Sequence, residues 1–374
     1  MVIGTAETGD NIVPSYPRSL SALPLSALSR RSFLKRSALA TAAVAAGPTL
    51  LTACGSEPAG AGGEGEAITF LSYLPLETLS MAPELLAVAG GHFAKHGLDV
   101  QLQPVKGSPQ AMQTLLAGTG PVTRLGQIDV MTAVAESGQP LVNIGTLTRG
   151  SSLRFMYSKS DPLTKPEDFV GKTMGVPSEG GTSSKVVSLV LANAGIDPGR
   201  VRKQVTGLTP GTFNLVQQGR IAGYVVSIDT SNIVLSQHDD AGVFDPGTVV
   251  KSDSQVYVAT KDVIQSDPDM LKAFLAGIHD ALAAVVADTT LDETIAKLRE
   301  HYSFATLDDN KIAKQSLTVM RDLWTGGDPS KPLLVTDENA WVAGYEELTA
   351  AGIAKPGKDA ASWFDNSLLP QTKS

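Results

Sequence analysis

The chain of 374 residues has a formal net charge of −8 and a single cysteine. This acidic balance, without a block of Lys or Arg, excludes a basic surface for binding nucleic acid. One cysteine excludes an internal disulfide and a thiolate zinc site, and the five histidines form no group with metal-ligand spacing. We therefore expect no metal, no cofactor and no nucleic-acid partner.

The N-terminal region predicts export and lipid attachment. The adjacent Arg30 and Arg31, followed by Ser-Phe-Leu-Lys, resemble the twin-arginine export signal of bacteria. The Ala-rich apolar run that follows has about 16 residues, fewer than the roughly 20 of a membrane-spanning helix. Leu51-Thr52-Ala53-Cys54 resembles a lipobox, in which the cysteine is acylated and the preceding peptide is removed. The alternative is an ordinary anchor helix with an incidental cysteine.

The mature part that this signal implies is acidic and long enough for two lobes. Its net charge is about −11, because five basic but only two acidic residues precede Cys54. Residues 55–66 are rich in Gly and poor in apolar side chains, which is typical of a flexible tether. The whole mature part has about 320 residues, enough for two lobes with separate cores.

From Ala67 onward, short apolar runs alternate with amphipathic stretches. The expected strands span residues 67–71, 99–105, 141–148 and 153–158. The expected helices span residues 83–96, 108–116 and 129–136. Pro83 suits the first turn of its helix, and Gly97 suits the position after the last turn. This alternation indicates a mainly parallel sheet covered by helices.

A second set of strands and helices follows the same pattern. Its expected strands span residues 173–176, 202–205 and 223–227. Its expected helices span residues 182–194, 212–218 and 230–237. A last strand at 255–260 precedes a stretch that is almost wholly helical, with helices at 267–287, 292–301, 308–324 and 337–351. The pattern alone therefore predicts two α/β lobes and a helical C-terminal tail.

Three segments share a pattern with a known family. They are residues 83–100, which include Gly97-Leu98-Asp99-Val100, residues 165–177, which begin Lys165-Pro166-Glu167-Asp168, and residues 191–197, which end Ala194-Gly195-Ile196-Asp197. In this order they resemble the substrate-binding proteins of ABC importers for nitrate, sulfonates, taurine and thiamine-pyrimidine precursors. The resemblance implies the type II periplasmic-binding-protein fold, with a ligand cleft between two lobes that close by a hinge.

This resemblance gives the expected organisation of the chain. We expect a signal region at 1–53, a tether at 54–66, the first part of lobe 1 at 67–156 and lobe 2 at 157–250. Residues 251–374 are expected to return to lobe 1 with one strand and the helical tail. One segment departs from the family pattern: residues 118–126 replace its Gly-x-Ala/Val-Asp-x-Gly motif, and Asp129 stands further along. The ligand specificity is therefore not carried over.

Ligands of doubly wound sheets lie outside the carboxyl ends of strands, where loops lead into helices. Four such loops supply the candidate ligand-binding residues. They are Ser72, Tyr73, Thr78, Ser80, Arg124, Gly126, Gly180, Gly181, Thr182, Ser183, Ser227 and Asp229.

The loop of Gly180, Gly181, Thr182 and Ser183 has the clearest chemistry, because helix N–H groups and hydroxyls suit a small anion or a carbonyl. Each candidate also has a purely structural interpretation. Thr182 and Asp229 suit the caps of their own helices. Arg124 suits a sulfonate or carboxylate ligand through two parallel N–H bonds, or an ion pair between loops. Tyr73 suits stacking on a ligand or packing at a lobe edge.

We expect an extracytoplasmic solute-binding lipoprotein, held to the outer face of the cytoplasmic membrane through lipid on Cys54. It would capture a small polar or anionic organic solute as a monomer and deliver it to an ABC permease. One alternative is a ligand-sensing domain for a membrane signalling partner. The other is an enzyme on the same fold. The sequence shows neither a nucleophile elbow nor the cysteine-rich run of the related fungal pyrimidine synthase, so we expect no catalytic residues.

Overall fold

The computed structural model describes residues 65–371. The predicted signal region at 1–53, with Arg30, Arg31 and Cys54, and nearly all of the predicted tether lie outside the described residues.

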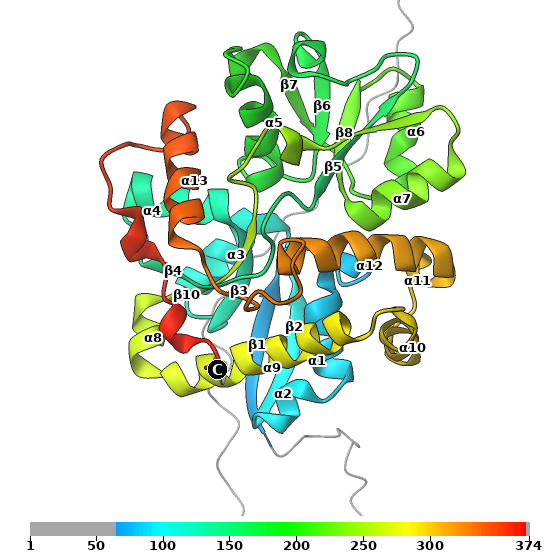
Figure 1. Cartoon of the computed structure of the whole chain (residues 1–374). Coiled ribbons are helices and arrows are strands. Elements are labelled where there is room, and N and C mark those ends of the chain that lie inside the picture. The colour runs from blue at the N-terminus through cyan, green and yellow to red at the C-terminus, as the bar shows by residue number, and fades with distance from the viewer. Residues whose placement is uncertain (1–64, 372–374) are drawn as a thin grey trace, which may run out of the picture. The chain divides into compact units, whose positions relative to one another are not determined.

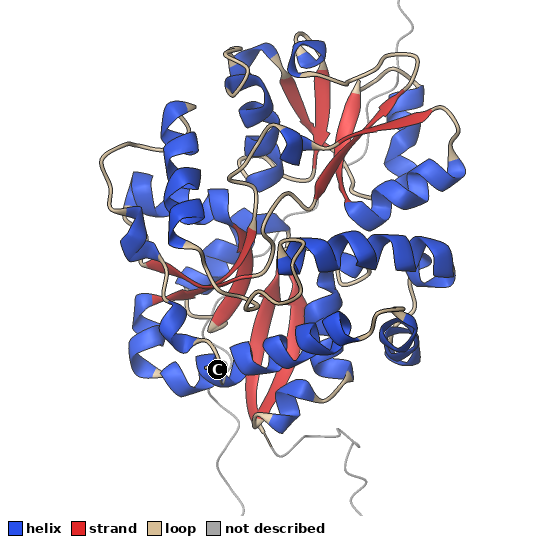
Figure 2. Cartoon of the chain, viewed as in Figure 1, coloured by secondary structure: helices blue, strands red, loops and turns tan. Residues whose placement is uncertain are grey.

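Within the described residues, ten strands form two five-stranded sheets (Figures 1 and 2). The first sheet has the order β2-β1-β3-β10-β4. Its strands are β1 (Glu66–Ser72), β2 (Leu98–Pro104), β3 (Val122–Gly126), β4 (Leu141–Thr146) and β10 (Gln255–Thr260). The second sheet has the order β7-β6-β8-β5-β9. Its strands are β5 (Leu153–Ser158), β6 (Thr173–Val176), β7 (Arg202–Val205), β8 (Gly223–Ser227) and β9 (Ala241–Phe244).

The helices lie between these strands and after β10. The first lobe and its neighbouring segments contain α1 (Ala82–Ala89), α2 (His92–Lys95), α3 (Gly107–Leu116) and α4 (Gln127–Ser137). The second contains α5 (Thr182–Ala192), α6 (Phe213–Gln217) and α7 (Ile228–Gln237). The C-terminal helices are α8 (Lys261–Ser266), α9 (Pro268–Ala287), α10 (Asp292–His301), α11 (Ala305–Asp308), α12 (Asn310–Thr325) and α13 (Glu338–Ala350). Short 3₁₀ turns include η1 (Leu79–Met81) at the entry to α1.

The sheets are mixed rather than mainly parallel. β1 pairs in parallel with β2 and β3, and β6 pairs in parallel with β7 and β8. β10 and β5 run antiparallel to both of their neighbours. Each of these two strands begins just after the chain has crossed from the other sheet. Hydrophobic periodicity reports which face of a strand is buried but not its direction, so the sequence did not reveal this.

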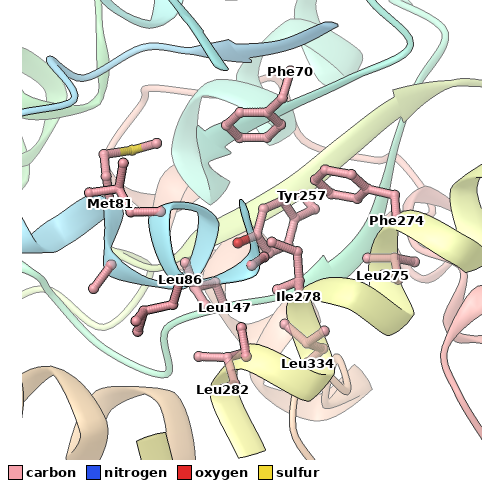
Figure 3. Close-up of a cluster of buried hydrophobic side chains, with 14 of the residues drawn as sticks. Phe70, Met81, Leu86, Leu147, Tyr257, Phe274, Leu275, Ile278, Leu282 and Leu334 are labelled. Atoms are coloured by element: carbon pink, nitrogen blue, oxygen red, sulfur yellow. The ribbon is translucent and has the colours of Figure 1, made fainter. Parts of the chain in front are cut away.

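The core of the first lobe is built from aromatic and branched side chains between the first sheet and α1, α2 and α9 (Figure 3). Phe274 of α9 stacks on Phe70 of β1 and on Phe93 of α2, with ring centroids 5.6 Å and 5.2 Å apart. The 20 residues of α9 are apolar enough to suit a membrane span by composition, yet half of its apolar window is buried inside the protein. We therefore interpret α9 as a core helix.

The second sheet has its own aromatic core. Three phenylalanine rings contact one another with ring centroids 5.3–5.9 Å apart. They are Phe155 of β5, Phe244 of β9 and Phe169, which lies before β6. They belong to a buried cluster that also contains Val186, Val187, Val190 and Leu191 of α5. These α5 residues recur at helical spacing, which is why this segment forms an amphipathic helix and covers the sheet.

Several elements differ from the sequence-based expectation. The helix expected at 83–96 is interrupted at Gly90-Gly91, and Gly91 adopts a left-handed φ of 67°, which separates α1 from α2. β9, α8 and α11 were not predicted, although the similarly short β6 and β7 were. The predicted division into lobes stays a prediction, and its boundary between residues 156 and 157 falls inside β5.

Candidate functional site

A cavity of about 270 Å³ lies at the carboxyl ends of β1, β3, β6 and β8. Both segments in which the chain crosses between the sheets also line it, as does α11. Its apolar wall consists of Leu74, Pro75, Leu153, Pro177, Leu208, Pro210, Val226, Ile233 and Ala305. Hydroxyl and amide groups interrupt this wall at intervals. Seven of the predicted site residues line the cavity: Tyr73, Thr78, Ser80, Gly126, Thr182, Ser183 and Ser227.

Tyr73 is the aromatic side chain among the described residues that line the cavity. Its hydroxyl accepts a hydrogen bond from Gln255 Nε2 at 2.7 Å, and the same Nε2 donates to Ser152 Oγ at 2.8 Å. Burial raises the pKa of the Tyr73 hydroxyl well above its ordinary value, so it stays neutral at physiological pH. The Arg124 guanidinium lies 5.8 Å from the centre of the Tyr73 ring. The ring is therefore held by polar contacts at its tip and by a cation beside it.

Arg124 does not line the cavity. It is fully buried, and its Nη1 donates to both carboxylate oxygens of Glu84 at 2.9 Å and 3.0 Å. Its Nη2 donates to the Ser80 carbonyl at 2.9 Å, and Tyr257 donates to the same carboxylate at 2.8 Å. A buried guanidinium is tolerated only when it is paired in this way. The geometry therefore matches the ion-pair interpretation of Arg124 and not direct ligand contact.

The Gly-Gly-Thr loop is used partly by the protein itself. Thr182 donates from its backbone N at 3.0 Å and from Oγ1 at 2.7 Å to Asp129, in the first turn of α4 on the other lobe. Lys185 Nζ lies 2.8 Å from the other oxygen of Asp129. Thr182 thus does not cap its own helix, because the capping position is Gly181. Gly180 and Gly181 do not line the cavity.

Asp229 makes the corresponding contact from the second lobe to the first. It lies in the first turn of α7, is buried, and does not line the cavity. It accepts hydrogen bonds from Thr78 Oγ1 at 2.9 Å and from the backbone N of Leu79 at 2.9 Å, both on the other lobe. Thr306 Oγ1 donates to it at 3.2 Å. Each lobe therefore places one helix-start aspartate against a helix start of the other lobe. We call these two contacts the aspartate bridges.

Ser72 and Gly126 differ in how they relate to the cavity. Ser72 is buried, does not line the cavity, and donates to the Leu74 carbonyl at 2.7 Å. Gly126 lines the cavity, and a Cβ built there would collide with Thr182 Oγ1. Its backbone angles, φ −70° and ψ 139°, are open to any residue. The glycine is therefore required for the approach of the other lobe and not for the turn.

The structure adds cavity residues that the sequence did not single out. They include Ser108, Ser152, Asp253, Gln255 and Thr306. Ser152 and Asp253 lie in the two segments in which the chain crosses between the sheets, and Ser151 Oγ donates to Asp253 Oδ2 at 2.5 Å. The rule used for prediction considers loops that lead from a strand into a helix, whereas the crossing segments end at the strands β5 and β10, so it omits them. Ser151 and Asp253 lie just before the strands expected at 153–158 and 255–260. This position is the only sequence feature that could have indicated these segments.

The charge of the cavity wall is negative. Among the described residues that line it, none is Lys, Arg or His, and the charged ones are Asp253 and Glu77. Glu77 is exposed, whereas Asp253 is only 3% exposed. Burial raises the pKa of the Asp253 carboxyl to about 7. The arrangement suits an organic solute with an apolar body and hydrogen-bonding groups better than it suits a strong anion.

A comparison with protein families shows to which family the chain belongs. The sequence profile of the family described as NMT1/THI5 like matches residues 78–290, more than half of the chain. The chain belongs to this family. The NMT1/THI5-like proteins that it resembles are substrate-binding proteins of ABC importers with the type II periplasmic-binding-protein fold, as its three sequence segments predicted.

Curated relatives of the family cover most of the chain. The riboflavin-binding protein of Chloroflexus aurantiacus is 22% identical over 80% of this chain and 85% of its own length. The formylaminopyrimidine-binding protein of Halalkalibacterium halodurans is 23% identical over 76% and 83%. The taurine-binding periplasmic protein of Escherichia coli is 27% identical over 59% and 69%. All three are named as binding proteins, in agreement with the expectation of a binding protein and not an enzyme.

Solved structures show the same fold. A protein from Bordetella bronchiseptica superposes with a TM-score of 0.67 at 18% identity, covering 82% of this chain and 96% of that one. The periplasmic aliphatic sulphonate binding protein of Escherichia coli superposes with a TM-score of 0.60 at 15% identity, covering 80% and 97%. This protein has the two α/β lobes and the C-terminal helices that were predicted, and its likeness to these structures confirms the predicted fold class.

Proposed function

We propose that this protein is the solute-binding component of an ABC import system and that the solute occupies the cavity between the two sheets. One observation carries the proposal: a cavity of about 270 Å³ is lined by loops from both lobes, and the aspartate bridges join these lobes beside it. A ligand that contacts both lobes stabilises the arrangement in which they lie together. The predicted hinge between the lobes is part of the proposal.

The cavity lining favours one class of solute among those that the relatives bind. Recognition of nitrate or a sulfonate in a buried site calls for Arg, Lys or a set of free N–H donors. The described lining has hydroxyls, an amide and a carboxylate but no basic side chain, and the Thr182 backbone N–H is already bonded to Asp129. Apolar side chains and Tyr73 provide room for a ring or a short alkyl body. The proposed solute is therefore a hydrogen-bonding organic molecule of pyrimidine-like size that carries no negative charge.

The proposed location follows from the sequence before Cys54, which lies outside the described residues. Export through Arg30 and Arg31 and acylation of Cys54 would place the protein at the outer face of the cytoplasmic membrane, beside an ABC permease. In cells, Cys54→Ser should move the protein from the membrane fraction to the soluble exported fraction. A protein that stays with the membrane in this variant would contradict lipid attachment.

Thermal unfolding of the full chain carrying Cys54→Ser tests the solute-binding proposal. The panel contains taurine, nitrate, an alkanesulfonate, formylaminopyrimidine and riboflavin. A solute at 100 times its dissociation constant should stabilise the protein by about 2.7 kcal/mol, which raises the unfolding temperature by a few degrees. We expect the shift from the uncharged ring compounds. A shift from the anions alone would contradict the proposed solute class. If none of the compounds raises the unfolding temperature, the result contradicts binding of solutes of these classes.

A further inference from the structure

The most unusual group in the cavity wall is the carboxylate of Asp253. Only 3% of the Asp253 surface is exposed, and the residue lines the cavity. One hydrogen bond reaches it in the described part of the chain, from Ser151 Oγ to Oδ2. Its Oδ1 has no protein partner there, and it is not among the fully buried unpaired atoms of these residues, so this oxygen is accessible from the cavity. A carboxylate whose residue is so largely buried is ordinarily satisfied on both oxygens, so Oδ1 is the atom that remains open to a solute in the cavity.

The charged groups around Asp253 do not neutralise it. Arg154 of β5 forms an ion pair with Asp245 at 3.2 Å. Asp129 of α4 accepts from Thr182 and Lys185, and Glu347 of α13 accepts from the backbone of Lys251 and Ser252. Tyr73, which also faces it, stays neutral. Asp253 thus lies among two other acids and one arginine that is already paired.

We propose that Asp253 is a specificity-determining residue, and that its free oxygen selects solutes that present an N–H donor, most strongly a cationic one, over anions of the same shape. This inference rests on the proposed function, since it assigns the ligand class of the same cavity. An ionised carboxylate only accepts hydrogen bonds, so an amino or amidinium group satisfies it while another carboxylate or a sulfonate repels it. The apolar wall and Tyr73 hold the body of the solute.

Three probes of one shape test this selection: benzamidine is a cation, benzamide is neutral and benzoate is an anion. Calorimetric titration uses the full chain carrying Cys54→Ser at pH 8, where Asp253 is ionised. We expect benzamidine to bind at least about 10-fold more tightly than benzoate, with benzamide between them. Asp253→Asn should weaken benzamidine binding by about 10-fold to 100-fold and change benzamide binding little. Asp269→Asn, which removes the same charge from an exposed site, should leave all three affinities unchanged.

The pH dependence of wild-type binding provides a second readout that needs no variant in the cavity. Because the free carboxyl has a pKa of about 7, its ionised fraction falls about 10-fold between pH 8 and pH 6. Benzamidine stays charged over this range, so its affinity should fall about 10-fold as the pH falls. In Asp253→Asn the affinity should be flat.

The outcomes separate this inference from the proposed function. Benzoate binding as tightly as benzamidine, or a benzamidine affinity that Asp253→Asn leaves unchanged, overturns the role of Asp253 while solute binding stands. Failure of all three probes to bind, when a member of the earlier solute panel does bind, also overturns it. Failure of the probes and of the whole panel contradicts the proposed function itself.

Discussion

The positive charge most suggestive of anion binding in this sequence, Arg124, lies behind the cavity wall and not in it. Its guanidinium bonds to Glu84 and to the Ser80 carbonyl, and it lies beside the Tyr73 ring that faces the cavity. We interpret Arg124 as a positioning residue that holds the loop after β1 in place. Arg124 has this role because it pairs with the Glu84 carboxylate on α1. A pairing between two residues 40 positions apart is not visible in the sequence.

Glu84→Gln tests this assignment. The substitution leaves the Arg124 charge buried without its partner, and breaking a buried pair in this way costs about 3–5 kcal/mol. Urea unfolding should show a loss of that order. The control is Glu300→Gln, which removes an acid from the exposed pair with Lys297 and should change stability by no measurable amount. If Glu84→Gln proves as mild as the control, Arg124 does not depend on this pair.

At the scale of elements, four helix starts meet in two pairs across the cavity. Asp129 at the start of α4 receives the start of α5, and Asp229 at the start of α7 receives η1. α4 follows β3 and α7 follows β8, and these strands hold the same place in the two sheets. The displaced Asp129, which departs from the family pattern in sequence, is therefore one half of an approximately symmetric arrangement.

Asp229→Asn should weaken both stability and solute binding. Asn keeps only one of the two oxygens that accept hydrogen bonds from Thr78 and Leu79 and removes the negative charge, so these hydrogen bonds are impaired. We expect a loss of about 2–3 kcal/mol in urea unfolding, with weaker binding of the solute found in the panel. The control is Asp309→Asn, which alters the cap of α12 within one lobe and should cost less than about 1 kcal/mol without changing affinity. Equal effects of the two variants on affinity would argue against a role of the bridge in binding.

Gly126→Ala tests whether the approach of the lobes matters for binding. The added methyl group fits the backbone of Gly126 but collides with Thr182 of the other lobe. The circular dichroism spectrum should stay unchanged, while solute affinity falls at least 10-fold, which corresponds to about 1.4 kcal/mol. Gly211→Ala is the matched control, because the nearest atom to its Cβ is 3.9 Å away. Wild-type affinity in Gly126→Ala would show that the solute binds without this contact.

At the scale of the whole molecule, the two-lobed α/β fold could be predicted and its connections could not. Strands such as β5 and β10 were predicted at their observed residues, because alternating and continuous apolar runs report burial directly. That both strands run antiparallel, and that the segments before them bring Ser152 and Asp253 to the cavity, depends on contacts between distant parts of the chain. The candidate site shows the same division: hydroxyls in strand-end loops were found, whereas Asp253 was not.

The central claim is that a small organic solute binds in the cavity between the two sheets. A crystal structure of the protein with the solute that stabilises it in the thermal panel tests this claim most directly. We predict electron density for one solute between Tyr73, Ser227 and Asp253, with an N–H group of the solute within hydrogen-bonding distance of the Asp253 carboxylate. A solute bound at full occupancy outside this cavity would contradict the claim.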